Sequence, residues 1–352
     1  MKGPALRALL TGTIALLIGF AVLAMGLAAA GYDPVLALGS LWRGAFGSWY
    51  ALTSATLVRS IPLIILGLGV ALGFRAGVFN IGADGQFYAG AIAATWVGLQ
   101  VAGWPAFAAI GAVWIAALVA GTFWIVVPVL LKVRFGVLEV ISTLLLNFVA
   151  EAMVSYAVTG PLMEAKRIYP QSDPVAAAAR LPALSGSRLH LGILVALVLA
   201  VLLWWVFTRT AWGFRLRAVG LGPRAAEVSG RISSRRVVAV ALLCSGALAG
   251  LGGGVEIGGV TYALFQNLSP GYGFSAIAVA LLARNHPIGV VCTGLLFGAL
   301  EAGAQGMQRE AGVPAVAVQV TEAVIILVIV LAEVLVRRAG TLRASQPGTE
   351  ER

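Results

Sequence analysis

Long apolar runs constrain the fold of this chain more than any other feature of its sequence. Segments of about 20 apolar residues, the length that crosses a bilayer as a helix, recur from one end of the 352 residues to the other. Only 11% of the residues are charged, whereas soluble domains carry about 25%. Polar and apolar residues do not alternate along the runs, which excludes a transmembrane barrel. The sequence therefore predicts an all-α, polytopic integral membrane protein.

We expect about eight to ten transmembrane helices, some of them broken or re-entrant. Ten candidate crossings lie at about residues 8–30, 57–74, 86–101, 105–131, 137–159, 189–207, 237–258, 274–284, 287–305 and 315–336. The first run is longer than the roughly 7–15 residues of a signal-peptide core, so we expect it to remain as an uncleaved span. The eighth is too short to cross alone. It is expected to be half of a broken helix that is buried against protein.

The basic residues predict the orientation. With an even number of crossings both termini lie on one side, and 17 of the 24 lysines and arginines then share that side. Since basic loops are cytoplasmic, both termini are expected in the cytoplasm. The net charge of +10 then reflects membrane topology rather than binding to nucleic acid. We expect one transmembrane domain over residues 1–340 and a cytoplasmic tail without fixed structure over residues 341–352.

Two loops are prominent in this topology. The cytoplasmic loop 208–236 carries seven arginines against a single acid, Glu227. It is either a surface that a partner binds or a basic loop that only sets the topology. The extracytoplasmic loop 160–188 is rich in Pro, Ser and Ala. It is either a lid or docking surface or an ordinary connector.

A polar, glycine-rich interruption at residues 73–86, GFRAGVFNIGADGQ, is the first candidate for function. It carries Asn80, Asp84 and Gln86. Unwound backbone at membrane depth is tolerated only beside protein or a water-filled path, and transporters place their paths at such breaks. The segment is therefore either part of a translocation path or a plain cytoplasmic turn.

Carboxylates within the apolar runs are the second candidate. Glu256 lies on the same expected helix as glycines at 246, 250, 254 and 258, whose four-residue period places small residues on one face for close helix packing. Glu301 lies in a later span. A carboxylate at membrane depth needs a partner or a polar cavity. Each of the two either lines a route for a polar solute or bonds one helix to another.

Several kinds of chemistry are missing from the sequence. None of the three lysines follows the glycine pattern of a phosphate loop, and His190 and His286 have no metal-ligand spacing. No motif for a catalytic nucleophile is present. We therefore expect no enzyme, no ATPase site and no cofactor or metal in this chain.

With these residues in view, the chain resembles the permease subunits of bacterial ABC importers. The likeness is to the group of simple-sugar and branched-chain amino-acid permeases, and above all to nucleoside permeases. It extends over about residues 50–336 and is carried by FNIGADGQ (79–86), FRLRAVGLGPRAAEVSG (214–230) and NLSPGYGFSAIAVALLARNHP (267–287). In that branch Glu is more usual than Asp at position 84, a change that keeps the charge.

The resemblance implies a subunit of the bacterial inner membrane that imports a nucleoside, or a simple sugar, by alternating access. Its partners would be an ABC ATPase subunit that binds the ATP, a second permease subunit, identical or related, and an extracytoplasmic substrate-binding lipoprotein. The candidate residues of the translocation path are Asn80, Asp84, Gln86, Glu256 and Glu301.

The resemblance also implies a coupling helix within residues 214–230 that docks into the ATPase. The residues themselves agree, because Pro223 can begin a helix that continues over Arg224–Val228. The expected contact residues are Arg217, Gly220, Pro223, Ala225, Ala226 and Gly230. Two other functions remain open. One is a proton-coupled secondary transporter in which Asp84, Glu256 or Glu301 carries the proton, and the other is a membrane enzyme or scaffold without transport.

Overall fold

The computed structural model describes residues 4–184, 186–228, 230, 232–314 and five positions beyond them, with side chains from residue 17 onward. The described residues form helices and two isolated β-bridges, Gln171 with Phe265 and Ala183 with His190. The prediction of an all-α membrane protein is confirmed. The expected crossing at 315–336 and the tail at 341–352 lie outside the residues described as continuous structure.

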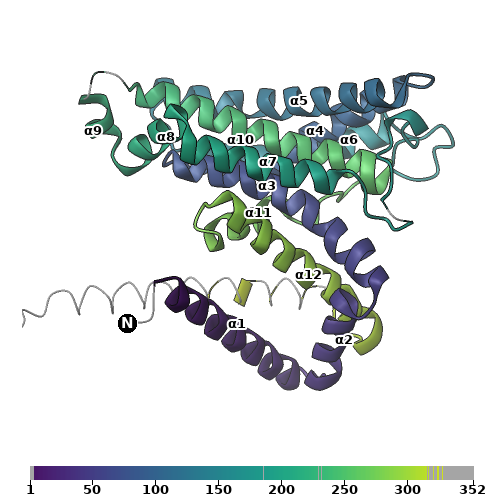
Figure 1. The fold of residues 1–352 in the computed structure, drawn as a ribbon. Helices are drawn as coiled ribbons and strands as arrows, with labels where there is room; N and C mark the ends of the chain where they lie inside the picture. Colours follow the sequence, from purple (N-terminus) through teal and green to yellow (C-terminus); the bar gives the residue numbers. More distant parts are fainter. Residues whose placement is uncertain are drawn as a thin grey trace, which may run out of the picture. The chain divides into compact units, whose positions relative to one another are not determined.

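The chain divides into two compact units, and each is described by itself. The first consists of residues 1–51 and 300–352, and the second of residues 52–299. The helices of the chain are α1 (Pro4–Ala29), α2 (Pro34–Phe46), η1 (Ala51–Thr56), α3 (Leu57–Arg75), α4 (Ala83–Gln100), α5 (Ala106–Phe135), α6 (Glu139–Thr159), η2 (Ala177–Ala179), α7 (Gly192–Arg209), α8 (Ala211–Leu221), α9 (Pro223–Val228), α10 (Ser234–Glu256), η3 (Ile257–Thr261), α11 (Tyr272–Leu282) and α12 (Pro287–Ala311) (Figure 1).

Six helices in the described part of the chain are long and apolar enough to cross a membrane. They are η1 with α3, then α5, α6 and α7, then α10 with η3, and finally α12. Two shorter apolar helical stretches, Leu17–Ala29 and α11, add to these. The 11 residues of α11 rise only about 16 Å, so α11 is too short to span alone, as its sequence predicts.

The larger unit is built around α10, which packs against both α4 and α5. A Cβ added at Gly250 would overlap the carbonyl oxygen of Ala117 in α5, and one added at Gly90 in α4 would overlap the carbonyl oxygen of Gly250. Gly121 of α5 meets the carbonyl of Gly246 in the same way. The predicted small-residue packing face of this helix is therefore confirmed, and the backbones of three helices touch directly.

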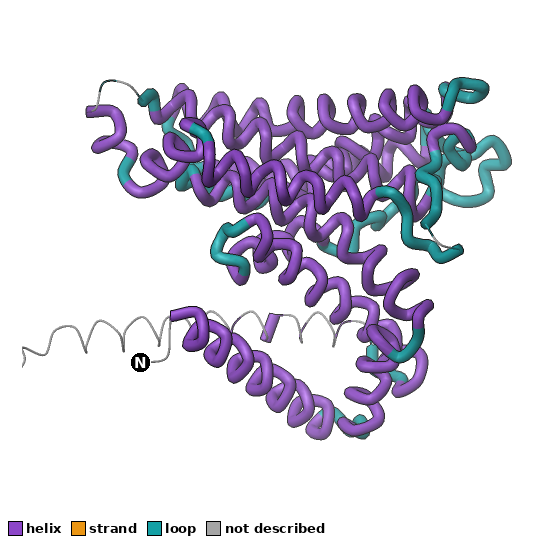
Figure 2. Tube along the Cα trace, in the orientation of Figure 1, coloured by secondary structure: helices purple, strands orange, loops and turns teal. Residues whose placement is uncertain are grey.

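The two ends of this bundle differ. The short helices α8 and α9 lie at the end where α10 begins, and the long segment between α6 and α7 lies at the opposite end (Figure 1). Figure 2 shows the latter as the largest concentration of loop in the molecule. Backbone hydrogen bonds tie this loop to the chain after α10: Ser172 N donates to Leu264 O (2.8 Å), Val175 N to Tyr262 O (2.8 Å) and Leu181 N to Gly258 O (2.7 Å).

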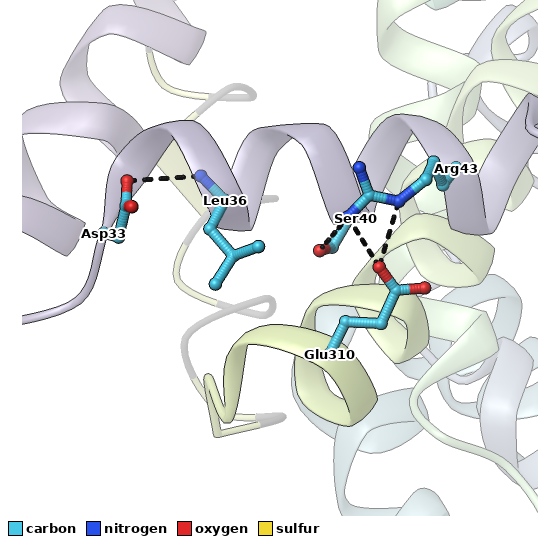
Figure 3. A network of polar contacts seen from close by, with 5 residues as sticks. All are labelled: Asp33, Leu36, Ser40, Arg43 and Glu310. Carbon is cyan, nitrogen blue, oxygen red and sulfur yellow. Dashed lines mark hydrogen bonds and ion pairs between the residues drawn. The ribbon is translucent and has the colours of Figure 1, made fainter.

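The smaller unit contains a helix that the apolar runs do not predict. Helix α2 begins at Pro34, and the Oδ1 atom of Asp33 accepts hydrogen bonds from the backbone N–H groups of Val35 (2.8 Å) and Leu36 (3.2 Å). This is an N-cap with proline in the first turn. Farther along α2, Arg43 forms a two-pronged bond to Glu310 Oε2 (3.0 and 2.6 Å), and its Nη2 atom also donates to Ser40 Oγ (Figure 3).

Candidate functional site

Asn80 and Gln86 form a closed hydrogen-bond network. Asn80 lies in the turn between α3 and α4, and Gln86 lies in the first turn of α4. The Nδ2 atom of Asn80 donates to Gln86 Oε1 (2.8 Å) and to Ser245 Oγ of α10 (2.9 Å), while its Oδ1 atom accepts from Gln86 Nε2 (3.0 Å) and from the N–H of Gly82 (3.0 Å). Asn80, Gln86 and Ser245 are all buried. The network holds the turn against α10.

Asp84 faces a different neighbour. Its Oδ1 atom accepts a hydrogen bond from Ser269 Oγ (2.7 Å) and another from the backbone N–H of Gly273 (3.0 Å). Since Gly273 belongs to the first turn of α11 and Asp84 to the first turn of α4, the carboxylate lies at two helix N-termini, where a negative charge is stabilised. Asp84 thus joins α4 to the short helix α11.

A small cavity opens beside this carboxylate. Its volume is about 160 Å³, below the roughly 300–1,000 Å³ of sites that enclose a drug-sized ligand. Six polar residues line it: Asp84, Tyr88, Asn147, Glu151, Asn267 and Ser269. Asn147 is held in place because its Oδ1 atom accepts from Gly85 N (2.8 Å) and its Nδ2 atom donates to Ile81 O (2.9 Å).

Glu151, which lines this cavity, lies at an unusual place for a carboxylate. It lies near the middle of the membrane-spanning helix α6 and is exposed, on a face that also carries exposed Leu145 and Phe148. A carboxylate at that depth is costly in lipid and normally faces protein or water. The exposed face of α6 therefore requires a cover other than hydrocarbon. The sequence contains Glu151 as one polar residue among many in the apolar runs, and only its position on an unpartnered face distinguishes it.

The remaining predicted path residues lie elsewhere. Glu256 is buried at the last turn of α10, where Arg59 and Arg188 act on it electrostatically. Glu301 is half-buried in α12, in the smaller unit. The structure thus brings Asn80 and Gln86 together, places Asp84 at the cavity, and leaves Glu256 outside both groups.

A short helix, α9, forms where the coupling helix is expected, with Pro223 as its first residue. Gly220 is inside α8, a helix that the sequence did not predict, and packs against the end of α3. A Cβ at Gly220 would overlap the carbonyl oxygen of Arg75. Ser234 Oγ of α10 donates to Pro223 O (2.9 Å), so α9 is fastened to the bundle as well.

The exposed side chains of this segment are partly unexpected. Ala225 is exposed, whereas Ala226 is buried. Arg217 and Gly230 are exposed too. Leu221 and Val228 are the most open apolar residues of the segment, with 91% and 88% of their surface accessible. Both apolar side chains stand among charged neighbours in the sequence.

The segment between α6 and α7 contains two buried ionisable groups, Glu164 and His190. Glu164 accepts hydrogen bonds from the N–H groups of Ile168 and Tyr169 and from the side chain of Gln171, and the Gln171 bond is the main reason that the pKa of this carboxyl lies below its usual value. Burial lowers the pKa of His190 to about 4. The Nδ1 atom of His190 accepts from Gly192 N (3.2 Å), so the imidazole is held neutral.

Comparison with known proteins places the chain among transport proteins. The profile of a family described as "Branched-chain amino acid transport system / permease component" matches residues 52–332. The chain is 39% identical over 341 residues to the glucose ABC transporter permease protein TsgB13 of Haloferax volcanii, covering 94% of this chain and 89% of that protein.

Two proteins of Bacillus subtilis are also similar. The chain is 40% identical over 324 residues to the guanosine ABC transporter permease protein NupP, covering 91% of this chain and 92% of that protein. It is 28% identical over 258 residues to the guanosine ABC transporter permease protein NupQ, covering 69% of this chain and 78% of that protein. Within the described residues, no cluster of three or more His, Cys, Asp or Glu side chains could hold a metal ion.

Proposed function

This chain belongs to the family of branched-chain amino acid transport system permease components, and we propose that it is the transmembrane subunit of an ATP-driven importer of a nucleoside or a simple sugar. As a permease subunit it is not itself an enzyme, because members of this family lack an ATPase domain. The main support for this substrate class is the similarity to a guanosine permease, which is 40% identical over nearly the whole of both chains. The similarity to a glucose permease supports a sugar as the second candidate.

The proposed assembly contains two permease subunits, two ABC ATPase subunits and an extracytoplasmic binding lipoprotein. The exposed Glu151 supports the second permease, since it requires protein or water at the middle of α6. That a single Bacillus subtilis strain has two guanosine permeases similar to this chain favours a related rather than an identical partner. The binding lipoprotein would dock on the loop 160–188.

We infer an orientation in the bacterial inner membrane with both termini in the cytoplasm. The basic segment 208–236 is then cytoplasmic and reaches the ATPase. Residues 1–340 would act as one transmembrane permease domain, of which the two compact units are parts.

Coupling would run from the ATPase through α9 and α8 to the turn between α3 and α4. The exposed Leu221, Ala225 and Val228 would contact the ATPase, with Arg217, Pro223 and Gly230 around them. The contact between Gly220 and the Arg75 carbonyl would carry the movement to the turn that holds Asn80. From there α4 leads to Asp84. The contact of Gly220 with Arg75, the turn that holds Asn80 and the first turn of α4 would thus join the ATPase surface to the cavity.

The translocation path would pass the cavity that contains Asp84 and Glu151. The cavity volume of about 160 Å³ is small for a complete substrate site, and the second permease would supply the other half of the path. Carboxylates and amides in the cavity would accept and donate hydrogen bonds to the hydroxyl groups of a ribose or hexose. Asn80 and Gln86 would support the path from behind, and Glu256 and Glu301 would contribute less directly. The path would open to each side in turn as the ATPases bind and hydrolyse ATP.

Reconstitution tests this proposal. Proteoliposomes containing this chain, its ATPase, the second permease and the binding lipoprotein are expected to accumulate radiolabelled guanosine only with ATP. Glucose in place of guanosine tests the second substrate. Uptake driven by a proton gradient without the ATPase would instead identify a secondary transporter, and no loss of uptake after deletion of the gene would favour a protein without transport activity.

A further inference from the structure

A cavity of about 450 Å³ lies where α5 ends and α10 begins, away from the proposed path. Three basic residues line it, Lys132 and Arg134 of α5 and Arg235 of α10. Its volume is within the usual range for a ligand of a few dozen atoms. The proposed coupling and translocation path assign no contact to Lys132, Arg134 or Arg235 themselves.

The three basic side chains of the basic cavity differ in whether an acid is paired with them. The Nζ atom of Lys132 lies 2.6 Å from Glu139 Oε2, so this lysine is paired within the protein. Arg134 and Arg235 are exposed, and no ion pair is recorded for either among the described residues. Two guanidinium groups therefore remain available to an anion, and such groups can bind phosphate through paired hydrogen bonds.

The backbone of α10 adds further donors. Ser233 occupies the N-cap position but makes no capping bond with its side chain. The hydroxyl of Ser234 donates to Pro223 O instead. Neither serine therefore caps the first N–H groups of this 23-residue helix, and these groups, together with the helix dipole, favour an anion at the mouth of the cavity.

The surface of α5 decides which anion fits. The exposed residues of α5 before Lys132 are all apolar, and Phe123, Val127 and Leu130 form a row that leads one helical turn later to Arg134. In contrast to the exposed face of α6, this row carries no charge. It is suited to acyl chains, and Phe135 beside the cavity is also exposed.

We propose that the basic cavity formed by Arg134, Arg235 and the first turn of α10 binds the phosphate group of an anionic phospholipid, whose acyl chains lie along the row from Phe123 to Leu130. Basic pockets between spans are a known kind of headgroup site. The ligand is a phosphodiester lipid with net negative charge, such as phosphatidylglycerol. The site holds α5 and α10 together at the membrane surface, independently of the substrate that is transported.

Native mass spectrometry of the purified full-length chain tests this assignment. Titration with phosphatidylglycerol and with phosphatidylcholine of the same acyl chains is expected to show about tenfold tighter binding of phosphatidylglycerol. The double variant R134Q/R235Q should lose this preference. The double variant R209Q/R215Q removes two exposed arginines elsewhere on the basic segment and should keep it. An equal preference in R134Q/R235Q and in the unmodified chain would overturn the proposal.

A second measurement separates the lipid from a free anion. Inorganic phosphate and glycerophosphoglycerol, which lacks acyl chains, are expected to compete with phosphatidylglycerol only at concentrations at least a hundredfold higher. Competition at equal concentration would identify a soluble anion as the ligand. Displacement of the lipid by the purified ATPase would assign the basic cavity to a protein interface. Either result would contradict the lipid site.

Discussion

The Oγ atom of Ser269 lies 2.7 Å from Oδ1 of Asp84 and donates a hydrogen bond to it, although 185 residues separate the two in sequence. The same carboxylate oxygen accepts the N–H of Gly273. Asp84 therefore joins α4 to α11 through these two hydrogen bonds and also supplies a negative charge to the proposed path. Mutation can separate the two roles, because the hydrogen bonds require only an oxygen acceptor whereas the path requires the charge.

Asp84→Asn keeps an oxygen acceptor and removes the charge. We expect a melting temperature within a few degrees of the unmodified protein and a loss of uptake of at least about tenfold, which corresponds to about 1.4 kcal/mol. Asp84→Ala removes the acceptor as well and should cost about 1–3 kcal/mol of stability, since a buried N–H loses its partner. Thermal unfolding and uptake in proteoliposomes measure the two effects. Full uptake by Asp84→Asn would remove Asp84 from the path.

Gly220→Ala places a Cβ on the carbonyl oxygen of Arg75. We expect α8 to shift, with a cost of about 1–3 kcal/mol, and transport-stimulated ATPase activity to fall more than ATPase binding. Gly222→Ala is the matched control, because its Cβ would meet nothing closer than Ala225 Cβ at 3.6 Å. Equal ATPase stimulation in both variants would show that the contact does not transmit the movement.

The exposed apolar residues at the end of α8 and in α9 predict where the ATPase binds. Leu221→Glu, Ala225→Glu and Val228→Glu each place a charge on the proposed contact and should abolish co-purification of the ATPase, while the chain still inserts in the membrane. Leu221→Met and Val228→Met preserve apolar surface and should retain it. Normal co-purification with the glutamate variants would exclude α9 as the docking helix.

The exposed Glu151 predicts water or protein, rather than lipid, on its face of α6. In a C244A/C292A background, Glu151→Cys should react with a charged, membrane-impermeant thiol reagent at least about tenfold faster than a cysteine at Val119, an exposed position of α5 one helical turn before Phe123, because the reactive thiolate needs water. Substrate and binding protein should slow the reaction at position 151. Equal slow labelling at both positions would place Glu151 in lipid.

The buried His190 predicts a pH dependence of stability. Its pKa falls from 6.5 to about 4 on folding, so the unfolded chain binds a proton first and the contribution of His190 to stability declines as pH falls from 6.5 toward 4. The loss should reach about 2 kcal/mol at pH 5. Glu164, whose pKa is lowered from 4.5, adds a loss only below that value. Because other buried groups also titrate in this range, the contribution of His190 is the difference between the melting curves of the unmodified chain and of a His190 variant from pH 7.5 to pH 5.

His190→Asn keeps an acceptor for the Gly192 N–H and should abolish this decline while lowering stability at pH 7.5. His286→Gln, which changes an exposed histidine, should leave the decline unchanged. A decline of the same size in His190→Asn would assign the effect to other groups.

Apolar length and glycine spacing predict much of this fold, because hydrocarbon accepts only long helices and helices pack closely only through small residues. The crossings, the glycine face of α10 and the short α11 are all visible in the sequence. Helices α2 and α8 are not, since α2 is too short to span and α8 contains Gly213 and Gly220, which are poor helix formers in isolation. Tertiary contacts stabilise both.

The candidate site was less predictable than the fold. The motif that contains Asn80, Asp84 and Gln86 indicates one polar locus, yet the structure turns Asp84 away from the other two. Helical geometry separates neighbours by about 100° per residue, so three polar residues within seven positions need not share a surface. In the sequence Glu151 is only one of many polar residues. The cavity that it lines is formed with Asp84 and with residues 267–274, which are far from it in sequence.

The direct backbone contacts among α4, α5 and α10 restrict how this molecule can move. Packed helices slide past one another by small shifts of interdigitated side chains, but at Gly250 no side chains separate α10 from its two neighbours. We therefore expect the three helices to move together in the proposed transport cycle. An engineered bond or label pair within this trio would report no distance change during a transport cycle, whereas one that joins the trio to α7 or α11 would.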